Sequence, residues 1–420
     1  MAEQLPRRTM LKLGALGALS LGIEACRAEE TDEAAGATPL RPPESVDDAA
    51  WASVRAQFMI DPGTAYMNNA SLGMPPRQVV DAVAAGYAAI SEEPLHGKHD
   101  LQGAISERVM PRLGRLFGVT ASEISLTRNA TEALHLQTLG LQLRSGDEVL
   151  ITTQEHPAGA QPWRLRAARE GIRVVEVPIP SPLPSTPELV ERIESAVSPR
   201  TRAIAFCHVT RGGHLYPVAE LCAMARRRGL LSLVDGAQAV GQFPIDLREV
   251  GCDAYSASLH KWMLGPVGTG FMFVSETSRD RIVTTFAPDA TMDMPQHGPP
   301  GTADFPVRAA IESSLDFVTT LGLDRIEARC RYLSDHLKSR LGELDSVDLL
   351  SGRREQSAPG QTIFEKAGLD AVASVPLMEQ VAAAHIDEHQ RDGHNAIRVS
   401  THVYNTIAEI DRLVEALSSA

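Results

Sequence analysis

The sequence predicts an α/β protein, with a large domain built on a mostly parallel seven-stranded sheet and a smaller α+β domain at the C-terminus. Short apolar runs rich in β-branched residues alternate with helical patterns from about residue 120 to residue 275. The runs are apolar almost throughout, which is typical of parallel strands covered by helices on both faces. From about residue 306 onward the pattern changes to long helices and weaker strands.

Seven runs have the length and composition of strands. They are EISLT (123–127), EVLITT (148–153), IRVVEV (172–177), RAIAFCHV (202–209), LLSLVD (230–235), AYSAS (254–258) and TGFMFV (269–274). Helical segments are expected at 130–143, 158–170, 187–197 and 218–228. Parallel sheets of this kind bind ligands at the carboxyl ends of their strands, so the functional residues are expected there.

The chain is expected to divide into five parts. Residues 1–26 are a signal segment and residues 27–50, rich in Ala, Pro, Glu and Asp, are a disordered linker. Residues 51–95 are extended and then helical, and they pack on both domains. The large domain covers 96–305. The small domain covers 306–420, with helices at 306–320 and 322–342, a strand at IRVS and a final helix.

The N-terminal segment predicts export. Arg7 and Arg8 precede an apolar run from Leu11 to Ile23, which is too short to span a bilayer. RRTMLK resembles a twin-arginine export signal, so a periplasmic or otherwise extracytoplasmic location is expected. Lipid attachment at Cys26 and cleavage near residues 35–37 are two alternatives for its fate.

Composition narrows the range of partners. The net charge is −13, and phosphate binding needs a concentrated basic face, so a nucleic acid is not expected as a partner. The cysteines after the leader lack CxxC spacing and lie in apolar segments, and we interpret them as buried, with a disulfide as the alternative. They are Cys207, Cys222, Cys252 and Cys330. His385 and His389 have the i, i+4 spacing of metal ligands on a helix, but no third ligand is evident and no metal site is predicted.

Polar side chains follow several of the predicted strands. Each has an ordinary explanation on its own: a helix cap, a turn residue, or a lysine whose ammonium reaches solvent. Together they supply a carboxylate, a flat aromatic base, a lysine in an apolar run, and a helix start with a hydroxyl to hold an anion. In chain order they are Asn129, Thr131, His156, Asp235, Gln238, Ser258, His260 and Lys261.

One cofactor, pyridoxal 5′-phosphate, needs all of these groups. Its aldehyde requires a primary amine, its phosphate requires hydrogen-bond donors, and its ring nitrogen requires an anion that keeps it protonated. An apolar, cationic surrounding favours the neutral amine of Lys261, which makes it available as nucleophile and base. The sequence therefore predicts pyridoxal phosphate bound at Lys261.

The chain resembles the class V aminotransferase superfamily of fold-type I pyridoxal-phosphate enzymes, which includes cysteine desulfurase-like and isopenicillin N epimerase-like proteins. The resemblance runs from YMNNASLG (66–73) to the C-terminus. It is carried by TRNATEAL (127–134), TTQEH (152–156), VDGAQAVG (234–241), SASLHK (256–261) and IRVSTHVYNT (397–406).

The resemblance implies a role for each matching residue. Lys261 forms the Schiff base and moves the α-proton, Asp235 pairs with the ring nitrogen, and His156 stacks on the ring. Gln238 contacts the ring hydroxyl. The phosphate is held by Ala130, Thr131, Ser258 and His260, and by Thr302 of a neighbouring subunit, which implies a homodimer.

For the substrate, the resemblance implies an amino acid or amino-acid-like compound. Arg398 would clamp its carboxylate as a bidentate fork, and Asn69 would face the substrate. Arg211 departs from the family pattern, which commonly has a small polar residue or Asn at this position. It is expected either to add a cation for an acidic substrate or to be an arginine of a surface loop. Residues 382–400 contain no cysteine in the place where cysteine desulfurases carry their nucleophile.

We therefore expect an epimerase or a C–S or β-elimination lyase. A true aminotransferase and a non-catalytic exported binding protein are the alternatives. A nicotinamide dehydrogenase is rejected because no strand is followed by GxGxxG.

Overall fold

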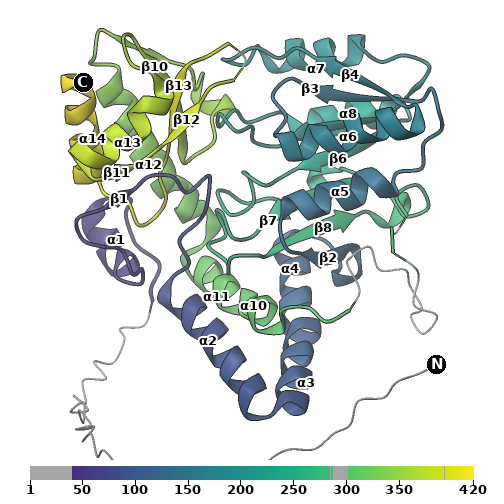
Figure 1. Cartoon of the computed structure of the whole chain (residues 1–420), viewed down its shortest axis with the longest axis horizontal. Helices are drawn as coiled ribbons and strands as arrows, with labels where there is room; N and C mark the ends of the chain where they lie inside the picture. The colour runs from purple at the N-terminus through teal and green to yellow at the C-terminus, as the bar shows by residue number, and fades with distance from the viewer. Residues whose placement is uncertain (1–39, 284, 287–300, 392) are drawn as a thin grey trace, which may run out of the picture. The chain divides into compact units, whose positions relative to one another are not determined.

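The computed structural model describes residues 40–283, 285, 286, 301–391 and 393–420, and residues 40–420 belong to one compact unit (Figure 1). The predicted signal segment, Cys26 and residues 27–39 of the predicted linker lie outside the described residues. None of the helices described is both long enough and apolar enough to cross a membrane.

The predicted seven-stranded sheet is confirmed. Its strand order is β2-β8-β7-β6-β5-β3-β4, and β8 is the one strand of this sheet that runs opposite to the other six. The seven strands are β2 (Ile124–Thr127), β3 (Glu148–Thr152), β4 (Arg173–Val177), β5 (Thr201–Cys207), β6 (Leu231–Asp235), β7 (Ala254–Ser258) and β8 (Gly270–Val274).

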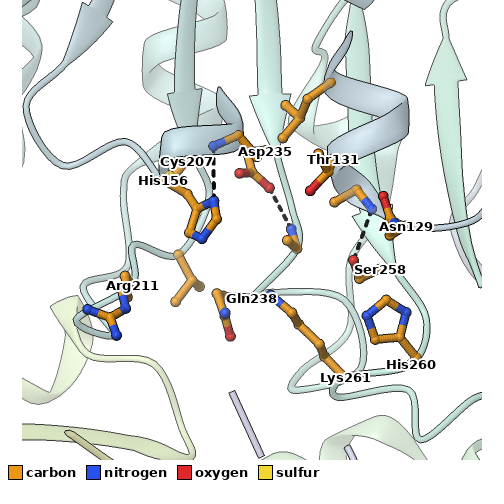
Figure 2. Close-up of a pocket in the computed structure, with 15 residues that line it drawn as sticks. Asn129, Thr131, His156, Cys207, Arg211, Asp235, Gln238, Ser258, His260 and Lys261 are labelled. Atoms are coloured by element: carbon orange, nitrogen blue, oxygen red, sulfur yellow. Dashed lines mark hydrogen bonds between the residues drawn. The ribbon is translucent and has the colours of Figure 1, made fainter. Parts of the chain in front are cut away.

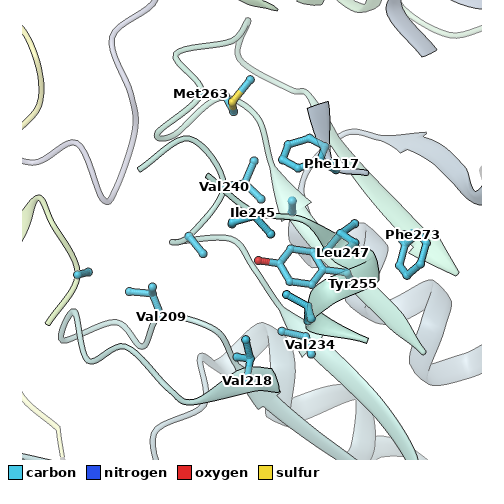
Figure 3. Close-up of a cluster of buried hydrophobic side chains, with 14 of the residues drawn as sticks. Phe117, Val209, Val218, Val234, Val240, Ile245, Leu247, Tyr255, Met263 and Phe273 are labelled. Atoms are coloured by element: carbon cyan, nitrogen blue, oxygen red, sulfur yellow. The ribbon is translucent and has the colours of Figure 1, made fainter. Parts of the chain in front are cut away.

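Helices cover both faces of this sheet, and this explains why its strands are apolar almost throughout. In β3, Leu150 belongs to one cluster of buried apolar side chains, while Val149 and Ile151 belong to another. The helices of the first cluster include α4, α7, α8 and α11, and those of the second are α5 and α6. Figure 3 shows part of the first cluster, where Phe117 and Phe273 lie near Tyr255. The helices between the strands are α5 (Ala130–Gly140), α6 (Pro157–Glu170), α7 (Thr186–Ser195), α8 (Val218–Arg227) and α9 (Leu247–Val250).

The N-terminal part begins with a helix that starts at the end of the predicted linker and continues beyond it. Helix α1 (Asp48–Arg55) is capped by Asp47, whose side chain accepts a hydrogen bond from the N–H of Ala50, and it buries Trp51 and Val54. These two apolar residues follow the predicted linker, and their burial orders its last three residues as the start of the helix. The elements that follow are β1 (Ala65–Tyr66), α2 (Arg77–Glu92), α3 (Pro94–Ala104) and α4 (Met110–Leu116).

The C-terminal part contains a four-stranded antiparallel sheet in the order β12-β13-β10-β9, packed with α12, α13 and α14 around its own apolar cluster (Figure 1). This confirms the expected smaller α+β region, whereas the predicted domain boundaries stay a prediction. Its elements are α10 (Phe305–Ala309), α11 (Ile311–Leu321), α12 (Leu323–Leu341), β9 (Val347–Leu349), β10 (Gln361–Lys366), α13 (Ala371–Ala382), β11 (Ala384–His385), β12 (Asp387–His389), β13 (Ala396–Ser400) and α14 (Ile407–Ser419).

Two local expectations for this part were wrong. The helix expected at 306–320 is divided at Ala310, whose carbonyl accepts an i to i+3 bond from Ser313 at 3.1 Å. HIDEH is not helical, because His385 ends β11, which pairs with β1, and His389 ends β12 in the four-stranded sheet. The two imidazoles therefore lack the shared helix face that the spacing suggested.

Candidate active site

A cavity of about 200 Å³ lies at the carboxyl ends of the parallel strands and gathers most of the predicted site residues. Figure 2 shows their side chains around one common space. The predicted residues that line it are Ala130, Thr131, His156, Arg211, Asp235, Gln238, Ser258, His260 and Lys261.

Lys261 follows β7 and lines this cavity. Burial lowers the pKa of its ammonium from 10.5 to about 8, although the nearby Asp235 opposes the shift. The backbone at Lys261 is closely covered by the segment that contains Gly73, whose N–H donates to the His260 carbonyl at 2.9 Å. A Cβ at Gly73 would lie 1.8 Å from the Lys261 carbonyl oxygen, so only glycine allows this approach.

Asp235 ends β6 and is buried at the inner side of the cavity. Its Oδ1 accepts a hydrogen bond of 2.9 Å from the N–H of Ala237. Burial raises the pKa of this carboxyl, and the Ala237 hydrogen bond and the charge of Lys261 act in the opposite direction. A cation placed against Oδ2 would stabilise the ionised form, which is the requirement of a protonated pyridine nitrogen.

His156 is the N-cap of α6, and its Nδ1 accepts a hydrogen bond of 3.1 Å from the N–H of Ala158. The imidazole is exposed at the cavity. Its pKa is lowered to about 4, mainly by desolvation and to a smaller extent by the charge of Lys261. The ring is therefore neutral near pH 7 and presents a flat face to the cavity.

The groups predicted to hold the phosphate lie where α5 begins. Asn129 caps this helix by accepting the N–H of Glu132 at 2.9 Å, and the N–H of Ala130 donates to the Ser258 hydroxyl at 3.0 Å. His260 donates from Nδ1 to the Thr269 carbonyl at 2.9 Å, which leaves its Nε2 available. A helix N-terminus, two hydroxyls and an imidazole thus meet at one end of the cavity.

Gln238 is held rigidly at the opposite side. Its Nε2 donates to the Ala70 carbonyl at 2.9 Å, and its Oε1 accepts from the indole N–H of Trp262 at 2.9 Å. One amide hydrogen is left to reach a ring hydroxyl.

Three predicted residues lie outside the cavity lining as described. The side-chain Oδ1 of Asn69 accepts from the Tyr404 hydroxyl at 2.8 Å, and Thr302 lines a separate hollow with Tyr87 and Pro306. Arg398 is buried in β13, where its Nη2 donates to Asp387 and to the Oδ1 of Asn68. The guanidinium that was expected to bind the substrate carboxylate is therefore already hydrogen-bonded to Asp387 and Asn68.

Sequence reasoning missed the part played by Asn68, Asp387, Cys207 and Glu155. Arg398 contacts Asn68 and not Asn69. The sequence held a signal for this, because side chains alternate between two faces of an extended segment. Ala65, Met67 and Asn69 share the buried face, which leaves Asn68 on the other one.

Cys207 ends β5, lines the cavity, and donates from its thiol to Glu155 at 3.1 Å. Burial holds the pKa of Cys207 well above its usual range and raises the pKa of Glu155 to about 7. Cys207 is therefore a protonated thiol near neutral pH. The four cysteines from Cys207 to Cys330 are all buried and free.

The donor set fits pyridoxal phosphate. A lysine amine whose pKa is lowered to about 8, a buried carboxylate, a neutral flat ring and a helix start share one cavity of about 200 Å³. An α/β fold with these groups at its strand ends defines a pyridoxal-phosphate enzyme of fold-type I.

Within that class, the chain belongs to the aminotransferase class-V family, whose model matches residues 65–413. This family depends on pyridoxal phosphate, so membership confirms the predicted family, enzyme class and cofactor.

Relatives with named activities match almost the whole chain. Isopenicillin N epimerase from Streptomyces clavuligerus is 30% identical over 393 residues, covering 88% of this chain and 98% of that protein. A probable cysteine desulfurase from Xylella fastidiosa (strain Temecula1) is 27% identical over 416 residues, covering 90% and 97%. A solved variant of C-DES with glycine covalently linked to its PLP cofactor is 23% identical with a TM-score of 0.78, covering 87% and 98%, and shows the same fold.

Proposed function

We propose that the chain removes the α-proton of an amino acid or amino-acid-like compound and completes the reaction by epimerisation or by loss of a β-substituent. The observation that carries this proposal is the position of Lys261, whose pKa is lowered to about 8, in the same cavity as the buried Asp235. The likeness to an isopenicillin N epimerase supports the first outcome, and the likeness to cysteine desulfurases supports the second.

Bound pyridoxal phosphate supplies an electron sink that acidifies the α-C–H of an amino acid joined to it. Asp235 holds a proton at the pyridine nitrogen by placing a carboxylate against it. Lys261 holds the cofactor and, once released as a neutral amine, accepts the α-proton. His156 would contact the ring with a neutral imidazole.

Two observations argue against formation of a persulfide on the protein. Residues 382–400 contain no cysteine. Among the residues that the structure describes, Cys207 supplies the thiol that lines the cavity, and it has a pKa well above the usual range and donates to Glu155. A thiolate is required as a sulfur nucleophile. Loss of a β-substituent, if it occurs, therefore proceeds without a protein-bound sulfur.

One experiment separates the candidate outcomes. The holoprotein is reduced with borohydride, and the peptide that contains Lys261 is expected to carry a pyridoxyl group. It is then incubated with a panel of amino acids in D₂O while inverted amino acid, pyruvate, ammonia, sulfide and pyridoxamine phosphate are measured. Deuterium at the α-carbon with inversion supports epimerisation, whereas pyridoxamine phosphate supports the alternative of an aminotransferase.

A protein that binds pyridoxal phosphate but carries no pyridoxyl group after reduction would support the alternative of a non-catalytic binding protein. Lys261→Ala is the matched control, because it lacks the amine that reduction would label.

The quaternary state and location are proposed separately. The resemblance supports a homodimer in which Thr302 reaches the cofactor phosphate of the neighbouring subunit, and in one chain Thr302 lies outside the cavity, in a separate hollow. Arg7 and Arg8 support twin-arginine export. Sedimentation and localisation of a tagged chain with both arginines replaced by lysine test these two proposals.

A further inference from the structure

Arg398 already holds a carboxylate that belongs to the protein. It lies in β13 directly opposite Asp387 of β12, and its side chain is 3% exposed. Its Nη2 donates to Asp387 Oδ2 and also to Asn68 Oδ1 at 3.2 Å. A buried guanidinium without a counter-charge is costly, so Asp387 stabilises the arginine when no substrate is bound.

The donors of Arg398 leave no complete edge for a second carboxylate. A guanidinium binds a carboxylate by two bonds through Nε with Nη2 or through Nη1 with Nη2, and both edges include Nη2. The two Nη2 hydrogens are directed to Asp387 and Asn68. Nε has no hydrogen-bond partner among the described residues, so this buried donor is available to a ligand. Bidentate binding of a substrate carboxylate therefore requires Asp387 or Asn68 to release Nη2.

Arg211 is a second positively charged partner for the Asp387 carboxylate. The Nη2 of Arg211 lies 3.4 Å from Asp387 Oδ2 and 2.8 Å from Glu388 Oε1, and Arg211 lines the cofactor cavity. Asp387 thus lies between two guanidiniums and can leave Arg398 while it keeps a positive partner. Arg211 and Arg398 are paired with Asp387 and Glu388, and Arg391 is a further cation that acts on Arg398. An entering carboxylate at Arg398 meets repulsion from Asp387, the carboxylate in direct contact with that arginine.

We propose that Asp387 determines the substrate specificity of this site by competing with the substrate carboxylate for Arg398. The inference rests on the proposed function, because it assumes an amino-acid-like substrate bound to the cofactor at Lys261. Small free amino acids then bind weakly, since they have little besides the carboxylate to displace Asp387. The preferred class is a larger amino-acid-like compound whose remaining groups contribute contacts of their own.

The test compares two probes of nearly equal shape, L-alanine and L-alaninamide, which differ in the negative charge. Each is titrated into the holoprotein, its Asp387→Asn variant and its Glu388→Gln variant, and the Kd is taken from the change in the spectrum of the bound cofactor. Glu388→Gln is the matched control, because Glu388 is the next residue of the same strand and bonds Arg211. Melting temperature and cofactor content are recorded for each variant.

We expect Asp387→Asn to lower the Kd of L-alanine by about tenfold and to leave that of L-alaninamide within about twofold, as removal of one competing charge should do. Glu388→Gln should change either Kd by less than about threefold. In the wild type, L-alaninamide should bind at least as tightly as L-alanine. This comparison does not depend on whether a variant folds.

Several outcomes would overturn the inference. Weaker binding of L-alanine to the Asp387→Asn variant would mean that Asp387 orients Arg398 for the substrate. The inference would also be overturned if Asp387→Asn changed the Kd of both probes equally, or if it left the Kd of L-alanine unchanged while the variant holds the cofactor. A wild type that binds L-alanine much more tightly than L-alaninamide would overturn it as well. Failure of the proposed function is seen separately, as absence of a pyridoxyl group on Lys261 after reduction.

Discussion

The Ser258 hydroxyl accepts a hydrogen bond of 3.0 Å from the backbone N–H of Ala130, and this bond joins the end of β7 to the first residue of α5. The two residues are 128 positions apart in the chain. The hydroxyl oxygen thus occupies one of the N–H groups with which a helix start binds an anion.

Ser258→Ala is expected to weaken binding of pyridoxal phosphate. Loss of the hydroxyl removes one donor to the phosphate and the link that positions Ala130. The Kd of the cofactor should rise about tenfold, corresponding to about 1.4 kcal/mol. Titration of the apoprotein followed by fluorescence measures it. Ser256→Ala is the control, because Ser256 is buried in the same strand and its hydroxyl has no partner among the described residues. Equal effects of the two substitutions would contradict the assignment.

Gly73→Ala is expected to displace the backbone that carries Lys261. The added methyl would lie 1.8 Å from the Lys261 carbonyl oxygen, and backbone atoms on both sides must shift. We expect at least about a tenfold loss of cofactor affinity, since misplacement of a reacting group by about 1 Å is costly. Gly63→Ala serves as the comparison, because its Cβ would approach only Asp61 Oδ1, at 3.6 Å. Unchanged cofactor binding by the Gly73 variant would show that the two segments are not tightly packed.

The covalent capture of pyridoxal phosphate by the apoprotein should depend on pH through Lys261. Only the neutral amine reacts, and its fraction rises as pH passes the pKa of about 8. The capture rate should therefore increase with pH to a midpoint near 8 and then level off. Stopped-flow absorbance measures this rate, with Nα-acetyl-lysine as the unburied reference. A rate that kept rising toward the ordinary lysine pKa would mean that burial does not lower the pKa of this ammonium.

Arg329→Met is expected to destabilise the fold without touching the cavity. The guanidinium of Arg329 is buried and donates to the Val46 carbonyl at 2.6 Å, to Asp48 at 2.7 Å and to the Asn405 carbonyl at 2.7 Å. Its removal leaves these acceptors unpaired, and the free energy of unfolding should fall by about 3 kcal/mol.

Urea unfolding of the holoprotein measures this difference. Arg325→Met, on the exposed side of the same helix, is the matched control and should change stability by less than about 0.5 kcal/mol. A destabilisation no larger than that of the control would contradict a role for Arg329 in holding α1.

The large sheet was predictable because its signal is local. Each strand is a short apolar run, and successive residues such as Leu150 and Ile151 lie in buried clusters on opposite faces, so no polar phase interrupts the pattern. The order β2-β8-β7-β6-β5-β3-β4 was not predicted, since hydrophobic runs carry no information about which strands become neighbours. The helical expectation for HIDEH was wrong for a related reason, because i, i+4 spacing places residues on one face of a strand as well.

The cofactor end of the site could be predicted from the sequence, because its residues end strands or begin helices. Lys261, Asp235, His156 and Ser258 needed only the rule that the carboxyl ends of parallel strands meet at one edge. The substrate end did not follow, because Arg398, Asn68 and Arg211 are brought together from distant segments. Nothing in IRVS indicates that Asp387 lies opposite its arginine.

The order of amino acids by itself determined the class of fold, the family and the chemical identity of the cofactor site, because these depend on local patterns and on residue types that the chemistry requires. Tertiary structure alone decided the pKa of Lys261, the tie between Ser258 and Ala130, and the pairing of Asp387 with Arg398. Desolvation and charge pairing depend on distances between groups that the chain brings together only when it folds.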